Sequence, residues 1–206
     1  MFTEKDNLYW KTFSDSINAQ FMERKYWYSP KAIHLYKGFS VVFDNYFFSS
    51  TVGTRSYESL LTRVYCKFTY PQSLKIRIEK ASFLNRLVNL FHGNLYRTLD
   101  REFDRQYHVH TMNPNTCVFL LPEIRRSLLD LNIEGLFIDT QDGIWGEQLT
   151  DNEYEVAIYV EATQLKQSEL VALKELFEGI LDALCDKFQI RTALTSFDRQ
   201  QTVASL

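Results

Sequence analysis

Glycine and proline are scarce in this chain, because its 206 residues include only seven glycines and four prolines. The sequence contains neither a G-x-G-x-x-G pattern nor a Walker-type phosphate loop. A cradle of backbone amides around a phosphate group is therefore not expected, and no cofactor is predicted. The chain also has no G-x-S-x-G nucleophile elbow and no cysteine in a family-type catalytic signature, so no catalytic residue is assigned.

Cysteines and long hydrophobic runs are equally few. Cys66, Cys117 and Cys185 lie far apart and form no C-x-x-C pair, which argues against a disulfide framework and against a thiolate zinc site. The longest apolar run, 117–121, is far shorter than the ~20 residues that a membrane helix requires. The charged segment 1–6 lacks the apolar stretch of a signal peptide. We therefore expect a cytoplasmic protein without membrane contact.

An excess of positive charge is also missing. The 26 acidic residues outnumber the 23 basic ones, and the formal net charge is −3. No global positive field is expected to attract nucleic acid or anionic lipid. The apolar share of 45% and the charged share of 24% are those of a chain that folds. The length favours a single α+β domain over residues 1–190 with a frayed tail at 191–206, although a division near 96–104 stays open.

Aromatic residues, in contrast, are abundant at 15% of the chain, so large flat side chains should dominate the core. Thr3 and Asp6 form a capping-box start, and apolar residues at helical spacing predict a first helix over about residues 5–24. Ser168 is expected to cap a last helix whose apolar face runs over residues 170–188. The two ends of the domain should therefore be helical.

Between these helices, hydrophobic periodicity of two predicts strands at 39–48, 63–69, 74–79, 107–111 and 155–160. In the third of these, apolar residues alternate with Lys75, Arg77 and Glu79, which predicts an antiparallel sheet with one face in water. Because strands come in runs, the fold class is predicted as α+β, with a mainly antiparallel sheet, amphipathic helices at both ends and a central helical segment.

Three local patterns describe the connections. Ser82 to Gly93 reads as a short capped helix, and Asn113-Pro114 offers a cap followed by a proline at the first helical position. Pro122 removes an amide donor, which predicts a kink or two consecutive helices. Asp142-Gly143, between the apolar segments 136–138 and 144–145, predicts a two-residue hairpin turn.

His108 and His110 are the most ligand-like residues. Two positions apart on a strand, they share one face and can grip a single metal ion, to which Asp104 or Asp100 can add oxygen ligands. Paired histidines on exposed strands are common without any metal, however, and a two-ligand motif is weak evidence. If residues 100–108 were helical instead, the acids and His108 would form a solvated face with exposed ion pairs.

Clusters of aromatic residues suggest a second kind of site. The segment Lys25-Tyr26-Trp27-Tyr28 alternates cations and aromatics as platforms for single-stranded nucleic acid do, but the acidic composition favours aromatics that enter the core. If they are exposed and contiguous, Trp27, Tyr28 and Trp145 would instead mark a surface for a protein partner.

Several short motifs resemble a group of uncharacterised bacterial proteins that share a domain of unknown function. The matching residues are Trp10 in the first helix, Lys37-Gly38-Phe39, Thr62-Arg63-Val64, Phe103-Asp104 with Tyr107, and Leu120-Leu121-Pro122-Glu123. The resemblance spans most of residues 8–186. It implies an α+β domain that occurs alone or behind membrane anchors, and it assigns no catalytic or binding residue.

These observations predict a non-catalytic interaction or accessory protein of a bacterial cytoplasm, with a protein as the possible partner. Two other classes stay open. One is a metal-dependent hydrolase that uses His108 and His110. The other is an immunity-type protein that binds a toxin through an acidic face.

Overall fold

The structure, a computed structural model, describes residues 2–25, 28–52, 55–80, 94–144 and 146–193. In these residues ten strands form one sheet in which all neighbouring strands are antiparallel. The strands are β1 (Gln20–Met22), β2 (Lys31–Tyr36), β3 (Phe39–Val52), β4 (Arg55–Thr69), β5 (Ile76–Lys80), β6 (Asn94–Tyr96), β7 (Tyr107–Thr111), β8 (Gly135–Asp139), β9 (Glu153–Val160) and β10 (Arg191–Thr192). Their order is β1-β2-β3-β4-β9-β8-β5-β7-β6, and β10 pairs with β4. The predicted α+β class is confirmed.

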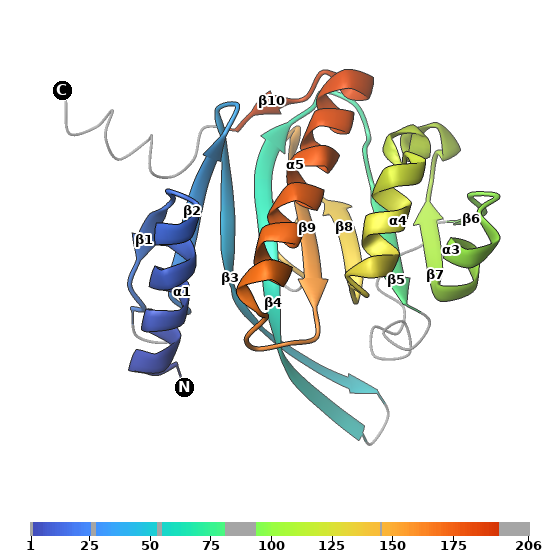
Figure 1. Cartoon of the computed structure of the whole chain (residues 1–206). Helices are drawn as coiled ribbons and strands as arrows, with labels where there is room; N and C mark the ends of the chain where they lie inside the picture. Colours follow the sequence, from blue (N-terminus) through green and yellow to red (C-terminus); the bar gives the residue numbers. More distant parts are fainter. Residues whose placement is uncertain (1, 26–27, 53–54, 81–93, 145, 194–206) are drawn as a thin grey trace.

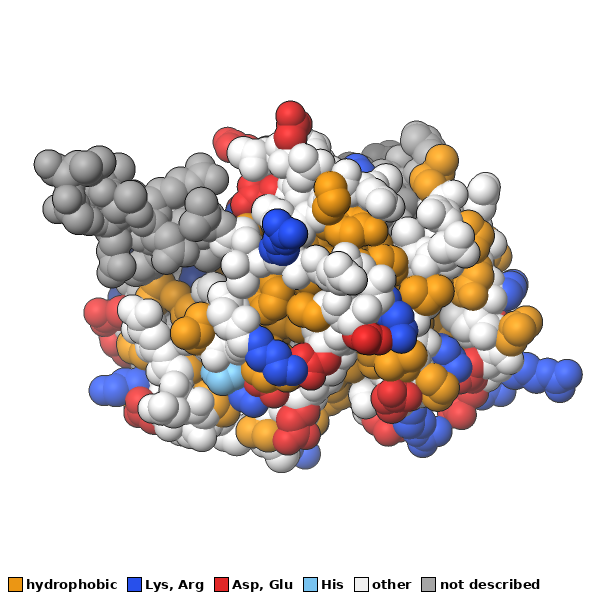
Figure 2. All heavy atoms as spheres, turned by 90° about the horizontal axis from the view of Figure 1, so that it is seen from above, with side chains coloured by type: hydrophobic (Ala, Val, Ile, Leu, Met, Phe, Trp, Pro, Cys, Tyr) orange, Lys and Arg blue, Asp and Glu red, His pale blue; other side chains and the backbone are white. Residues whose placement is uncertain are grey.

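The helices of the described residues are α1 (Glu4–Ser16), α3 (Arg101–Gln106), the 3-10 helix η1 (Pro114–Phe119), α4 (Pro122–Asp130) and α5 (Gln167–Phe188). Figure 1 shows α1, α5 and α4 on the same side of the sheet, so the main hydrophobic core lies between these helices and that face. No helix in the described part of the chain is long and apolar enough to cross a membrane. Seen from above, charged side chains of both signs are spread among hydrophobic ones (Figure 2).

Aromatic packing fixes α1 against the sheet. The indole Nε1 of Trp10 donates to Asn45 Oδ1 at 2.9 Å, and the Phe13 and Phe43 rings meet edge to face at 5.1 Å between centroids. The capping box is confirmed, since the Thr3 amide donates to the Asp6 carboxylate. The predicted extent of 5–24 is wrong, because α1 ends at Ser16 and the chain turns through Asn18 at φ +52° into β1.

The helix boundaries around Pro122 agree with the sequence. η1 ends at Phe119 and α4 begins at Pro122, so the two-helix alternative is confirmed. A proline at the first turn has no amide hydrogen to satisfy, which is why a helix starts there readily. The N-cap of α5 is Lys166 and not Ser168, because the Lys166 amide donates a hydrogen bond of 2.7 Å to the Glu169 carboxylate.

The prediction of a two-residue hairpin turn at Asp142-Gly143 is wrong. Strand β8 pairs with β9, and a long loop over residues 140–152 joins them. Within it, a bridge joins Gln141 to Gln148, and the Asp142 amide donates to the Glu147 carbonyl at 3.0 Å. The residues of the predicted turn bond to side chains of the sheet, as described below, and this tertiary pairing overrides the local preference for a tight hairpin.

The predicted wet face of segment 74–79 is also wrong. The alternation itself is confirmed, because Ile76 and Ile78 enter the main core. On the opposite face, however, Arg77 is 7% and Glu79 is 1% exposed. The Arg77 guanidinium lies 4.5 Å from the centroid of the Phe137 ring on β8. Periodicity shows which residues share a face, but not what packs against that face.

Two predicted segments lie wholly or partly outside the described residues. The helix from Ser82 to Gly93 falls in residues 81–93, and most of the tail falls in 194–206. The first residues of that tail are not frayed, because Arg191 and Thr192 pair with β4 and Ala193 is 6% exposed. The sheet therefore continues beyond α5.

Truncating a core aromatic of α1 should destabilise the fold strongly. Phe13→Ala removes the ring that packs on Phe43 and is expected to lower the free energy of unfolding by roughly 3–5 kcal/mol. Leu8→Ala on the same helix is the matched control, since Leu8 is 66% exposed, and it should change stability by no more than about 0.5 kcal/mol. Urea denaturation followed by tryptophan fluorescence measures both, and equal losses would show that α1 is not held through Phe13.

Candidate functional site

The sheet has a second face, remote from the helices, and polar side chains are concentrated on it. Because side chains alternate along a strand, the register brings one row of residues from six strands together on this face. The row is Asp44, Arg63, Tyr159, Gly135, Glu79 and His108, on β3, β4, β9, β8, β5 and β7 in that order. The adjacent row carries Tyr65, Ala157, Phe137, Arg77 and His110. Ionisable groups are thus arranged on a face that is largely buried.

A buried ion pair anchors one end of this face. Arg63 Nε and Nη2 donate to the two oxygens of Asp44 at 2.9 and 2.8 Å, and the residues are 6% and 3% exposed. The guanidinium also stacks on aromatic rings, 4.0 Å from the centroid of Tyr65 and 4.7 Å from that of Tyr46. Burial alone would lower the pKa of Arg63, but the Asp44 carboxylate holds it well above its ordinary value. Arg63 is therefore a permanent cation.

Glu155 on β9 lies beside this pair. It is only 3% exposed, although burial of a charged carboxylate is unfavourable. Its Oε1 is 3.9 Å from Arg63 Nη1 and accepts the Gly143 amide at 3.0 Å, whereas its Oε2 has no hydrogen bond within the described residues. Burial raises the pKa of Glu155 to about 8, although the positive charge of Arg63 opposes the shift. The side chain is mostly protonated at neutral pH.

The loop over residues 140–148 covers this end of the second face and is fixed by three polar contacts. The Asp142 carboxylate pairs with Lys67 at 2.9 Å, the Gly143 amide donates to Glu155, and the Ile144 amide donates to the Tyr46 hydroxyl at 3.1 Å. Ile144 is 3% exposed, and it packs with a small second hydrophobic cluster that contains Leu61, Phe137, Ala157 and Tyr159. The loop is thus part of the packed structure.

Gly143 is required at this position for two reasons. Its φ is +68°, where other residues are strained, and an added Cβ would lie 2.9 Å from the Tyr46 ring and 3.2 Å from Arg63 Nη1. Burial alone would raise the pKa of the neighbouring Asp142, but Lys67 and Arg63 hold that pKa below its ordinary value. Asp142 is therefore a carboxylate at neutral pH.

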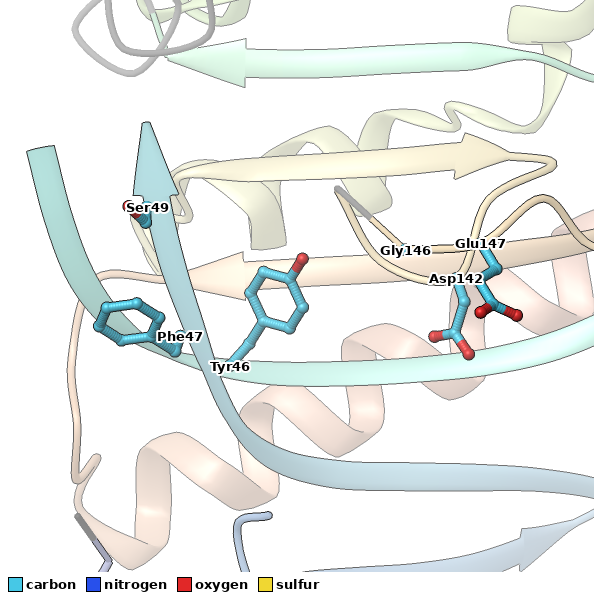
Figure 3. A pocket seen from close by; sticks show the side chains of 6 residues that line it. All are labelled: Tyr46, Phe47, Ser49, Asp142, Gly146 and Glu147. Atoms are coloured by element: carbon cyan, nitrogen blue, oxygen red, sulfur yellow. The ribbon is translucent and has the colours of Figure 1, made fainter. Parts of the chain in front are cut away.

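An open cleft of about 550 Å³ lies between this loop and β3, lined by Tyr46, Phe47, Ser49, Asp142, Gly146 and Glu147. Figure 3 shows the Tyr46 ring on the strand side, the Phe47 ring directed to the other side of β3, and the carboxylates of Asp142 and Glu147 next to each other on the loop side. The side chain of Asp142 is 46% exposed, although it forms an ion pair with Lys67. Phe47 is 58% exposed. The cleft therefore offers negative charge opposite aromatic surface.

The metal candidates lie elsewhere on the same sheet. His108 and His110 occupy one face of β7, as predicted, with ring centroids 6.3 Å apart. Five strand spacings separate β7 from β3, which is about 24 Å along the sheet. In register with His108, Glu79 has a pKa that burial raises to about 7 against the opposing charge of Arg77. Catalytic cooperation between the histidines and the cleft is therefore not expected.

The two aspartates upstream of the histidines have structural partners. Asp104 Oδ1 accepts hydrogen bonds from the Thr98 amide and hydroxyl, and Asp100 caps α3 through the Phe103 amide. Because α3 ends at Gln106, the helical alternative for residues 100–108 is wrong. No group of three or more His, Cys, Asp or Glu side chains in the described part of the chain is placed to hold a metal ion. The histidine-pair metal site stays a prediction.

Of the three aromatic candidates for a partner surface, the structure describes only Tyr28, which is 69% exposed. Trp27 and Trp145 fall outside the described residues, so their role stays a prediction. Sequence patterns did not point to the cleft. It is assembled from β3 and from a loop about a hundred residues later, and of its lining only Tyr46 and Phe47 belong to an aromatic run in the sequence, 46–48.

Comparison of the chain with protein-family models, with curated proteins and with solved structures gave no match. The resemblance to an uncharacterised bacterial domain therefore stays a prediction.

Replacing Glu155 should change how stability depends on pH. Its pKa is raised from about 4.5 to about 8 in the folded state, so only the folded protein holds this proton between those values. The group therefore makes stability fall as pH rises through that window, by at most about 1.4 kcal/mol per pH unit. In Glu155→Gln that contribution is lost, so the stability of the variant relative to the wild type should increase between about pH 5 and pH 8.

Urea unfolding at four pH values in that range measures this difference. Glu123→Gln, at an exposed position of α4, is the control and should follow the wild-type pH dependence. A constant difference between Glu155→Gln and the wild type across the range would contradict the raised pKa.

Proposed function

We propose that this protein is a non-catalytic interaction protein that binds a basic side chain of a protein partner in the cleft between β3 and the loop over residues 140–148. The observation that carries the proposal is the pairing of two carboxylates, Asp142 and Glu147, with the aromatic side chain of Tyr46 around one open cleft (Figure 3). Carboxylates and aromatic rings are the two kinds of group that bind cations in proteins.

The charges around the cleft support a cation as the bound group. Glu147 is exposed and forms no ion pair with a described residue. Asp142 is paired with Lys67 but keeps almost half of its exposure, so it can accept a second donor. Arg63 lies close to the aromatic wall, but Asp44 neutralises it through two hydrogen bonds. The cleft therefore keeps negative charge that an incoming cation can meet.

The hairpin that carries Tyr46 and Phe47 supports a macromolecular partner. Strand β3 pairs with β2 only up to Phe43, and β4 pairs with β9 only from Thr62 onward. Beyond these points, β3 and β4 continue as a two-stranded arm to Val52 and Arg55, which projects from the sheet in Figure 1. An exposed phenylalanine at the base of such an arm, next to a charged cleft, has the composition of an interface anchor. A basic toxin bound by an immunity-type protein is one case of this proposal.

The first experiment is an NMR titration with N-acetyl-arginine amide. We expect the amide resonances of Tyr46, Gly146 and Glu147 to shift, with weak but saturable binding. N-acetyl-citrulline amide is the matched control, because it has nearly the same shape without the charge, and it should bind at least tenfold more weakly. Glu147→Gln should weaken arginine binding about fivefold to tenfold, a loss near 1 kcal/mol that is typical of one exposed ion pair. Phe47→Ser should change arginine binding less than twofold, because the Phe47 ring points away from the two carboxylates.

Two further variants complete the design. Asp151→Asn lies in the same loop at an exposed position outside the cleft, and the double variant His108→Ala/His110→Ala lies on β7. Both should bind the arginine probe as the wild type does. Equal binding of the citrulline compound, or unchanged binding by Glu147→Gln, would refute the cleft as the binding site.

A further inference from the structure

A second recess lies on the opposite side of the molecule, between α4 and α5, which pack side by side. This α4–α5 groove has a volume of about 490 Å³. Its apolar lining consists of Ile124, Leu131, Ala172 and Leu176, its acidic lining consists of Glu123, Asp130 and Glu175, and Ser127 and Gly179 complete it. The apolar residues are buried or half-buried and the acids are exposed, so the groove has an apolar floor and an acidic rim.

Gly179 lines this groove, and no contact with the described residues requires a glycine at this position. It lies in the interior of the 22-residue helix α5 and is exposed. A Cβ built at this position would meet nothing within 4 Å. Glycine is the poorest helix former after proline, so the protein carries a destabilising residue where alanine would fit. What the glycine provides is bare helix backbone at the groove, which permits close approach by another chain.

The charge of the rim defines the chemistry of the occupant. Asp130 is already paired with Arg126 at 3.1 Å. Glu123 and Glu175, in contrast, form no ion pair with a cation of the described residues. Two uncompensated carboxylates therefore stand on either side of an apolar floor, one on α4 and one on α5. Lysine or arginine side chains of a partner would complement them.

The shape of the groove favours a helix as the bound segment. Ala172 and Gly179 are seven residues apart on α5, so the lined part extends about 10 Å along the helix axis. This length equals two turns of a helix, and apolar anchors at positions i, i+3 or i+4, and i+7 would lie over the floor. We propose that the α4–α5 groove binds a basic amphipathic helix of a protein partner, at a surface separate from the β3 cleft.

The test is fluorescence anisotropy with a labelled 18-residue peptide that carries leucines along one helical face and lysines and arginines on both flanks. A scrambled peptide with the same composition and charge controls for non-specific attraction to an acidic protein. We expect the amphipathic peptide to bind at least tenfold more tightly than the scrambled one at physiological salt. Equal binding of the two peptides would overturn the proposal.

Gly179→Leu separates docking from stability. Its side chain enters open space, so the variant should fold, and its melting temperature should rise by roughly 2–4 °C because leucine is the better helix former. The same side chain obstructs the groove, so peptide affinity should fall at least tenfold. Val171→Leu, on the exposed surface of α5 outside the groove lining, is the matched control and should bind normally. Unchanged affinity in Gly179→Leu would overturn the proposal.

Charge variants test the rim. Glu123→Gln/Glu175→Gln should reduce affinity about tenfold, whereas Asp15→Asn/Asp151→Asn, which removes two exposed acids outside the groove, should leave it unchanged. Equal losses in both would mean that only net charge matters and would overturn the proposal. Glu147→Gln in the β3 cleft should bind the peptide as the wild type does, which keeps the outcome for this groove distinct from that for the proposed function.

Discussion

The second face of the sheet depends on the buried pair of Arg63 and Asp44. Removing two charges from water is costly, and this cost is offset only when the pair is completely hydrogen-bonded and well packed. Here the carboxylate accepts two guanidinium hydrogen bonds, with Lys31 3.5 Å away, and aromatic rings lie over the guanidinium. Loss of one partner would leave a buried charge without its two short hydrogen bonds. The positions of β3 and β4 relative to each other are therefore tightly specified at this point.

The same pair explains why a long loop can lie over the sheet. Glu155 and Tyr46, which both contact Arg63, are the residues that accept the Gly143 and Ile144 amides. The polar groups of the loop are thus satisfied by side chains that the ion pair has already positioned. These contacts connect the buried ion pair to the loop, and the loop forms one side of the β3 cleft. The α4–α5 groove needs no such arrangement, because its walls are two helices whose apolar faces enter the main core.

Local periodicity predicted most of the elements but not what they touch. Strands β3, β4, β5, β7 and β9 and the two terminal helices follow from alternation and helical spacing, and the proline at 122 correctly separated two helices. Strands β1, β2, β6 and β10 were not predicted. The end of α1 was missed because Phe21 continues the helical spacing by chance while Asn18 adopts a left-handed conformation. The partners of Arg63 and the cover over Glu79 depend on strand order, which joins residues far apart in the chain. No pattern within one segment contains that information.

The projecting end of the β3–β4 hairpin has a further consequence. Beyond Tyr46 on β3 and before Thr62 on β4, neither strand has a second neighbouring strand among the described residues. Each outer edge therefore presents backbone amides and carbonyls to solvent, and such edges can pair with an edge of another chain. An arm that offers free edges to a partner offers the same edges to a second copy of this chain.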